Sequence, residues 1–387
     1  MHPGYLFKIS LQESKRLMRL MLRFKKLASR LIYPLDLKTV SNEHAAPVNH
    51  IVCTSTPRSR RFSVAAALVF ALVTAVASAQ KYTSIVIFGD SLSDVGNDAD
   101  LSQAKYGFRL PGPAFDYTDG RFTDGMDTVP AARNYFGVWI EQLAATFPAK
   151  PPIKASLDGG KDYAYGFAFT GAGTTDFTFG PGDELSITIN NVGQQITDYL
   201  ATHPKIDDKT LFVVWAGAND VINATSPKVI IDAAVDQATN VQRLIDAGAT
   251  QFIVPNLPNL GAIPRFNGSP VTSVPATKAT VLYNTVLKAG VDVVSLFNPG
   301  KKIVQFDVYG LITKVLASPA KYGLVDVTDS SQGNYVINPD TYLFWDDLHP
   351  TTKGHNILAQ SAAGLLAPCN SWNPVECELF AIGAAQK

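Results

Sequence analysis

The chain has 387 residues, of which 46% are apolar and 17% are charged, so it can bury a large core and is neither a disordered nor a fibrous sequence. Its formal charge of zero combines two unlike parts, because residues 1–61 carry 12 basic against 3 acidic side chains and residues 62–387 carry 21 against 30. The acidic balance of the larger part argues against nucleic-acid binding, which needs a basic face.

Residues 62–79 have the pattern of a secretory signal peptide. Three arginines precede an uncharged apolar stretch, and Ala77-Ser78-Ala79 places small residues at the last and third-last positions. We expect cleavage after Ala79 and a secreted, extracellular protein with no stable membrane insertion afterwards. The alternative is a retained anchor, because about 18 uncharged residues lie at the lower limit for spanning a bilayer.

Residues 1–61 precede this signal and are predicted to be a basic extension outside the mature protein. An over-extended gene start would explain them, and an amphipathic targeting helix from Lys15 to Arg30 is the alternative. Residues 80–387 show no linker or internal repeat and are predicted to form one domain.

Short apolar runs after residue 83 predict strands that are buried on both faces, as in a parallel sheet. These runs are 84–88, 211–217, 251–255 and 302–307, with 162–169 as a weaker fifth strand. Apolar residues at three- and four-residue intervals predict helices over 134–147, 189–203, 229–248, 278–297 and 352–366. This alternation predicts an α/β domain with right-handed crossovers.

Two loops, 107–133 and 174–190, are predicted to shape a cleft. Their aromatic residues either line an acyl pocket, stack on a sugar or pack in the core. These residues are Phe115, Tyr117, Phe177 and Phe179.

The first predicted strand ends in Gly89-Asp90-Ser91-Leu92-Ser93. In open α/β sheets, sites gather at the carboxyl ends of strands, which makes Ser91 a candidate nucleophile. A helix-capping role is the alternative for a serine in this place.

A serine nucleophile needs a neighbouring base, and residues 80–387 contain three histidines. His349 follows Asp346 by three residues, so the carboxylate can hold one ring nitrogen and leave the other to accept the serine proton. His203 is predicted to lie on the surface after a helix, and His355 is predicted to be structural within the closing helix.

Stabilising the oxyanion of acyl transfer requires hydrogen-bond donors, and two further strand ends offer them. Asn219 follows the second strand, and Gly171 and Gly173 follow the weaker strand, where a glycine lets backbone N–H groups approach a substrate closely. A turn or cap role is the alternative for each of these residues.

Four segments occur in the order of the four sequence blocks of the GDSL lipase/esterase family, also called SGNH hydrolases, which the chain therefore resembles. They are FGDSLSDVGN at 88–97, the Gly171 segment, GAND at 217–220 and DDLHP at 346–350. The resemblance extends from about residue 84 to 366. It implies a flavodoxin-like three-layer α/β/α sandwich with a central, mainly parallel five-stranded sheet.

The resemblance also implies a role for each matching residue. Ser91 would be the nucleophile and one oxyanion donor, and Gly171 and Asn219 would be the other donors. His349 would be the base, with Asp346 as its partner because the family spacing is Asp-x-x-His. Asp347 then has no catalytic role. The second block departs from the family, since Phe169-Thr170 precede Gly171 where a second glycine is expected, and Gly173 remains a weaker candidate.

The sequence thus predicts a secreted serine esterase or lipase that hydrolyses acyl or acetyl esters through an acyl-enzyme, without cofactor or metal. Its substrate would be a small-molecule, lipid or acylated-carbohydrate ester. Two alternatives stay open, an acetyl esterase acting on plant cell-wall carbohydrate and an inactive binding protein on the same scaffold. Residues 80–387 contain no Gly-x-Ser-x-Gly elbow, which argues against the α/β-hydrolase fold.

Secretion carries two further expectations. Cys369 and Cys377 form an even pair in an oxidising compartment, which predicts a local disulfide near the C-terminus. Asn223 and Asn267 each begin an Asn-x-Ser/Thr acceptor for glycosylation.

Overall fold

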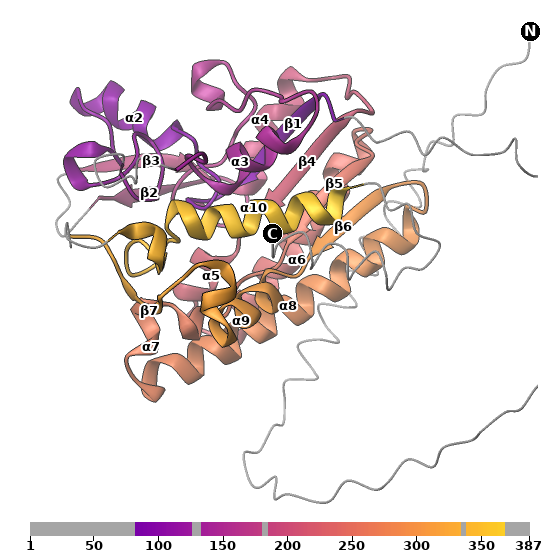
Figure 1. The fold of residues 1–387 in the computed structure, drawn as a ribbon. Helices are drawn as coiled ribbons and strands as arrows, with labels where there is room; N and C mark the ends of the chain where they lie inside the picture. The colour runs from indigo at the N-terminus through magenta and orange to yellow at the C-terminus, as the bar shows by residue number, and fades with distance from the viewer. Residues whose placement is uncertain (1–81, 126–132, 180–184, 334–337, 368–387) are drawn as a thin grey trace, which may run out of the picture.

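The computed structural model describes residues 82–125, 133–179, 185–333 and 338–367 (Figure 1). The basic extension, the signal peptide and the Cys369–Cys377 pair all lie outside the described residues. Their predictions therefore remain predictions.

Four strands form a parallel sheet in the order β1-β4-β5-β6. They are β1 (Ser84–Gly89), β4 (Thr210–Trp215), β5 (Gln251–Pro255) and β6 (Lys302–Phe306). The three strands β1, β4 and β5 are buried almost throughout, as their apolar, β-branched sequences predict. The predicted α/β fold class with a mainly parallel central sheet is confirmed.

The prediction of a fifth strand at 162–169 is wrong. Asp162 forms a parallel bridge with Ile87 on the outer edge of β1, and the Tyr165 N–H donates to the Gly89 carbonyl at 3.3 Å. The segment then leaves the sheet, because the Asp162 carboxylate accepts the Ala164 N–H at 2.9 Å and Phe167 adopts a left-handed φ of 63°. Because non-glycine residues seldom adopt this conformation, the sequence carries no signal for the turn.

Helices flank the sheet in two groups, which gives the layered arrangement visible in Figure 1. In one group α3 (Trp139–Thr146) packs on α10 (Thr352–Leu366). In the other α4 (Val192–Thr202), α6 (Pro227–Asp246) and α8 (Pro270–Phe297) pack on one another in sequence order. All five helices overlap the predicted ranges, and α10 has the predicted bounds.

Helix α8 begins eight residues before its predicted start. The Ser269 hydroxyl accepts the Val271 N–H at the N-terminus, and the helix continues through Pro275. By length and composition α8 is also the one described helix that could cross a membrane. Its inner face is buried in the core, however, where Tyr283 and Val291 are fully covered.

The remaining elements lie at the ends and edges of the sheet. They are α2 (Asn97–Tyr106), the antiparallel pair β2 (Thr174–Thr178) and β3 (Ser186–Asn190), α5 (Ala218–Ile222), α7 (Pro264–Asn267), α9 (Val308–Ala317), and the parallel pair β7 (Asp326–Ser330) and β8 (Tyr342–Phe344). The predicted loop 174–190 therefore carries a hairpin.

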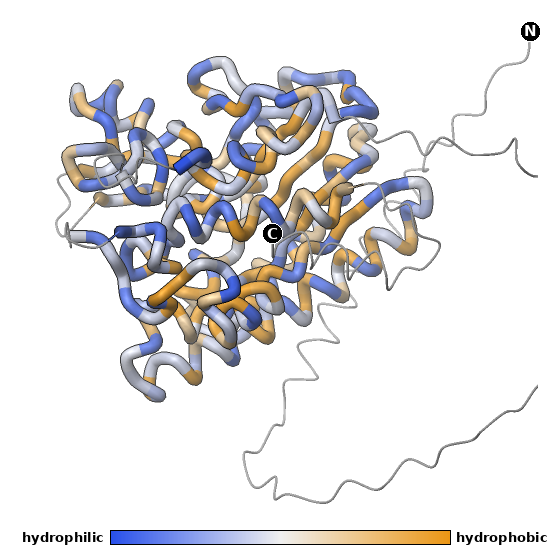
Figure 2. Tube along the Cα trace, viewed as in Figure 1, coloured by the Kyte–Doolittle hydropathy of each residue, from blue (hydrophilic) through white to orange (hydrophobic). Residues whose placement is uncertain are grey.

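The core lies on both sides of β4 and β5, and Figure 2 shows hydrophobic colour along these central strands. Trp139 of α3 packs edge-on against Trp215 at the end of β4, with ring centroids 5.2 Å apart. The Trp139 indole N–H donates to the Ser93 hydroxyl at 3.0 Å. The core thus reaches the turn that follows β1 and restrains it.

Candidate active site

Ser91 lies in a tight turn directly after β1, and backbone hydrogen bonds hold this turn. The Asp90 carboxylate accepts the Leu92 N–H at 3.1 Å, and the Ser93 N–H donates to the Asp90 carbonyl at 3.0 Å. Gly89 is needed at the strand end, because a Cβ there would lie 2.6 Å from the Trp215 carbonyl oxygen. The turn presents the Ser91 hydroxyl at the carboxyl edge of the sheet.

The structure brings Ser91, His349 and Asp346 together in one hydrogen-bonded chain. Ser91 Oγ lies 2.8 Å from His349 Nε2, although 258 residues separate them in sequence. His349 Nδ1 lies 2.7 Å from Asp346 Oδ2. Asp346 Oδ1 accepts the backbone N–H groups of Leu348 at 2.7 Å and of His349 at 2.5 Å. The three side chains are buried, and the cavity beside them includes Ser91 and His349 in its wall.

The carboxylates around Ser91 differ in charge state. Burial alone would raise the pKa of Asp346, but the positive charge on His349 and the hydrogen bonds from His349 and Leu348 outweigh it and lower the pKa to about 2. Burial raises the pKa of Asp90 to about 7 against its hydrogen bond from Leu92 and the charge on His349. Asp346 is therefore the carboxylate that stays ionised beside the imidazole.

Asp347, His203 and His355, which the sequence predicted to have no catalytic role, make other contacts than the hydrogen bonds that join Ser91, His349 and Asp346. Asp347 forms a half-exposed bidentate ion pair with Arg265, at 2.8 and 2.9 Å. His203 stacks on Tyr199, with ring centroids 4.3 Å apart. His355 is fully buried in α10, where burial above all lowers its pKa to about 3 and its Nδ1 accepts the Trp139 N–H. His355 is therefore neutral, as a structural histidine would be.

Asn219 lies in the first turn of α5 and lines the same cavity as Ser91. Its Nδ2 donates to the Ala168 carbonyl at 3.2 Å. Gly171 lies three residues after Ala168, and its carbonyl accepts the Gly193 N–H of α4 at 2.8 Å. Gly173 leads into β2 with a φ of 77°. Neither glycine is among the residues that line the cavity.

Two aromatic residues of the 107–133 loop contact the His349–Asp346 pair and were not assigned this place from the sequence. The Tyr117 hydroxyl donates to Asp346 Oδ2 at 2.7 Å. The Phe122 ring packs on the His349 ring, with centroids 5.0 Å apart. Tyr117 was expected from the sequence to line an acyl pocket, stack on a sugar or pack in the core, and nothing in the sequence indicated its contact with Asp346. Phe177 stacks on Phe167 instead, at 4.9 Å.

The cavity beside Ser91 is almost wholly apolar beyond the catalytic end. Its wall away from Ser91, Asn219 and His349 is formed by aliphatic side chains from the 258–263 turn, α9, β8 and α10, including Leu260, Ile263, Ile312, Leu343 and Leu358. The cavity has a volume of about 50 Å³, so it has room for a short aliphatic group. Among the described residues, no group of three or more His, Cys, Asp or Glu is placed to hold a metal ion.

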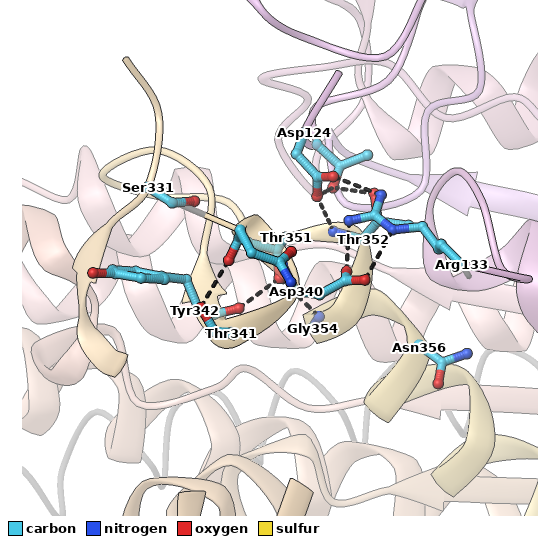
Figure 3. Close-up of polar contacts among 12 residues, drawn as sticks. Asp124, Arg133, Ser331, Asp340, Thr341, Tyr342, Thr351, Thr352, Gly354 and Asn356 are labelled. Carbon is cyan, nitrogen blue, oxygen red and sulfur yellow. Dashed lines mark hydrogen bonds and ion pairs between the residues drawn. The ribbon is translucent and has the colours of Figure 1, made fainter. Parts of the chain in front are cut away.

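A buried ionic network fixes the start of α10, which directly follows His349 (Figure 3). Arg133 bridges Asp124 at 2.6 Å and Asp340 at 2.5 Å, and both the Arg133 and Asp124 side chains are almost fully buried. Asp124 also accepts the backbone N–H of Thr352, the first residue of α10. A carboxylate at this position complements the helix dipole and supplies a missing partner for the first turn.

The model of the family described as GDSL-like Lipase/Acylhydrolase matches residues 85–362. The thermolabile hemolysin of Vibrio parahaemolyticus is 28% identical over 300 residues, which cover 71% of this chain and 62% of the hemolysin. Lipase 1 of Photorhabdus luminescens is 24% identical over 386 residues, which cover 79% of this chain and 54% of the lipase. A carbohydrate acetylesterase structure from Sinorhizobium meliloti matches with a TM-score of 0.32 and 12% identity, covering 72% of this chain and 96% of that one.

The chain belongs to the GDSL-like lipase/acylhydrolase family, as the order of its sequence blocks predicts. The matched part spans less than two thirds of the hemolysin and about half of Lipase 1.

Proposed function

We propose that the protein is a secreted serine esterase or lipase that cleaves carboxylic esters through an acyl-enzyme. The observation that carries this proposal is the 2.8 Å separation of Ser91 Oγ and His349 Nε2, with Asp346 on the far side of the imidazole. Secretion rests on the signal pattern at 62–79, and the mature enzyme would be the single domain 80–387.

In the proposed reaction, Ser91 Oγ attacks the ester carbonyl while His349 takes the hydroxyl proton. The tetrahedral intermediate collapses, the C–O bond to the alcohol breaks, and His349 returns the proton to the departing alcohol. Water then attacks the acyl-enzyme while His349 takes its proton, the bond from the acyl carbon to Ser91 Oγ breaks, His349 returns the proton to Ser91 Oγ, and the carboxylic acid leaves. Asp346 stabilises the imidazolium throughout and does not itself take the proton.

The oxyanion needs donors on the same side of the carbonyl. We assign the Ser91 N–H and Asn219 Nδ2 to this role, because both residues line the cavity. The family pattern assigns the third donor to Gly171. A second candidate for that donor is the Phe167 N–H. Phe167 directly precedes Ala168, whose carbonyl accepts the hydrogen bond from Asn219. Phe167 also adopts a left-handed conformation of the kind found at functional sites.

The substrate we propose is an ester with a short aliphatic acyl chain. The aliphatic side chains beside Ser91, such as Leu260, Ile312 and Leu358, are themselves buried, and the cavity between them has a volume of about 50 Å³. Each methylene group placed there would contribute about 0.8 kcal/mol, and the volume limits the acyl chain to a few carbons. The name of one relative, Lipase 1 of Photorhabdus luminescens, agrees with an ester substrate.

The test is hydrolysis of p-nitrophenyl esters of rising acyl length by the purified protein and its Ser91→Ala variant. Ser91→Ala should lower kcat by at least about 10⁴-fold with unchanged thermal unfolding. Ser84→Ala on the same strand, whose hydroxyl contacts the exposed Lys161, is the matched control and should retain activity. Turnover by Ser91→Ala at the wild-type rate would eliminate Ser91 as nucleophile. A preference for acetylated sugars over butyryl and longer esters would overturn the aliphatic substrate.

A further inference from the structure

We propose that Tyr117 is a positioning residue for the catalytic carboxylate, holding Asp346 Oδ2 through its hydroxyl so that the imidazole keeps its orientation and does not become more basic. This inference rests on the proposed function of Ser91, His349 and Asp346. It adds a fourth member to their hydrogen-bonded chain, contributed by a loop that lies 229 residues earlier in the sequence than Asp346.

The hydrogen bonds of Asp346 show why this member matters. Oδ1 accepts two backbone N–H groups, from Leu348 and His349. Oδ2 accepts the His349 Nδ1 hydrogen and the Tyr117 hydroxyl hydrogen, both at 2.7 Å. Each carboxylate oxygen therefore has two partners, which is close to its capacity. Without Tyr117, Oδ2 would have His349 as its single partner among these groups.

The Tyr117 ring is held in place by its neighbours. It packs edge-on against Trp345 and against Phe122, with centroids 6.3 Å away in both cases. The Tyr117 backbone is bridged to Asp124, and Asp124 is fixed by its ion pair with Arg133. The hydroxyl is thus presented by a rigid turn, which lowers the entropy lost in making the hydrogen bond.

The chemical effect follows from charge. Burial and the negative charge of Asp346 raise the pKa of Tyr117, so its hydroxyl remains a donor throughout the working range. By donating to Oδ2, it draws negative charge from the oxygen that faces the imidazole. Removing the hydroxyl leaves more negative charge on Oδ2 to stabilise the imidazolium, which favours the protonated form of His349. The acid limb of the pH profile, where activity falls as the pH is lowered, therefore shifts to higher pH.

Other charged or titratable groups also act on this pair and must remain constant in a test. Asp90 and His355 act on His349, Arg265 acts on Asp346 and Tyr117, and Asp347 acts on Tyr117. None of them changes in a Tyr117→Phe variant, which also keeps the ring that packs on Trp345. A shift of the pH profile in that variant therefore reports the hydroxyl.

The experiment compares kcat and KM against pH for the wild type, Tyr117→Phe and the matched control Tyr106→Phe. Tyr106 likewise donates a hydroxyl hydrogen bond, to the Ser186 carbonyl at 2.7 Å, but lies outside the site. Tyr117→Phe should lower kcat by about tenfold, as expected for losing a hydrogen bond to a charged group, with KM unchanged and the acid limb about half a unit higher. Tyr106→Phe should change neither.

The double variant Tyr117→Phe/Asp346→Asn completes a double-mutant cycle. When Asp346 is already replaced by Asn, Tyr117→Phe should produce no further shift of the acid limb. An unshifted acid limb in Tyr117→Phe, or equal effects of Tyr117→Phe and Tyr106→Phe, would overturn the positioning role while leaving the proposed function standing. If the Ser91→Ala variant retained the activity of the wild type, that result would instead overturn the proposed function, and the inference with it.

Discussion

Asp346 binds His349 through both of its carboxylate oxygens, one on the backbone N–H at 2.5 Å and the other on Nδ1 at 2.7 Å. The carboxylate of Asp346 therefore fixes the His349 ring relative to the backbone of His349. The spacing of three residues makes this closed arrangement possible, since Asp346 and His349 lie in one tight turn. The imidazole is oriented before any substrate arrives, and no ordering is needed at the moment of reaction.

Replacing Asp346 by Asn should lower kcat by about 10⁴-fold, because an amide cannot hold the imidazole in the reactive tautomer and charge state. Activity of the wild type should decline at acid pH as His349 takes up a proton, while Asp346 stays ionised. A pH–rate profile of both proteins checks this expectation. A flat acid limb for acylation in the wild type would contradict a histidine base.

The lowered pKa of Asp346 also predicts how stability depends on pH. Its folded-state pKa of about 2 lies below the unfolded value of about 3.9, so its contribution is present above pH 4 and is lost as the pH falls toward 2. Urea unfolding between pH 5 and pH 2.5 should therefore show a steeper loss of stability in the wild type than in Asp346→Asn. Parallel curves would contradict the ionised, hydrogen-bonded state of Asp346.

Asn219→Ala should reduce kcat by about 10²- to 10³-fold with little change in KM, since the amide is proposed to bind the oxyanion of the transition state. Asn223→Ala is a matched control one turn along the chain, where the side chain donates to the Asn219 carbonyl at 2.8 Å. Steady-state kinetics on a p-nitrophenyl ester distinguish the two. Equal losses in both variants would point to a local structural effect instead of a donor.

Gly217, which precedes Asn219 by two residues, cannot carry a side chain. Its φ is 117°, and a Cβ there would lie 2.3 Å from the Tyr283 ring. Gly217→Ala should lower the free energy of unfolding by roughly 3 kcal/mol or more, from backbone strain and overpacking together. Gly248 has a similar φ of 110° and nothing within 4 Å, so Gly248→Ala isolates the backbone part at about 1 kcal/mol. Chemical denaturation measures both, and equal losses would contradict the clash with Tyr283.

The ion pair between Arg133 and Asp124 should stabilise the fold through its burial. Asp124→Asn leaves Arg133 with a weaker partner and removes the charge at the start of α10, so we expect a loss of about 3 to 5 kcal/mol. Asp158→Asn breaks the exposed pair with Lys154 and should cost under about 1 kcal/mol. Denaturation curves check the difference, and a similar small loss for both would show that the buried network contributes little.

The sequence predicted those features that depend on local pattern. Buried apolar runs located β1, β4, β5 and β6, and the Thr351 hydroxyl, which accepts the Gly354 N–H at 3.0 Å, begins α10 as its position before the helix suggests. The fifth strand was wrongly predicted at 162–169, because Phe167 adopts a left-handed conformation there and no glycine in its place signals the turn. The β2–β3 hairpin was read as a loop, since Thr174–Thr178 is largely polar and only partly buried.

The site was predictable to the extent that its residues lie in short motifs. Ser91, Asp346 and His349 each stand in such a motif, and the structure brings them within hydrogen-bonding distance. Tyr117 was not predictable, because its contact with Asp346 depends on how a long loop folds over a distant turn. The placement of Gly171 depends likewise on the turn at Phe167, which the sequence does not reveal.

The two ends of the Ser91–His349 hydrogen bond are joined only once the chain has been made almost to the end of its domain. A ribosome-bound fragment that stops before residue 349 carries the alcohol but no base to activate it. On the proposed roles, the nascent polypeptide therefore cannot hydrolyse an ester before residue 349 has been added. The order of synthesis thus sets the earliest point at which the serine can react.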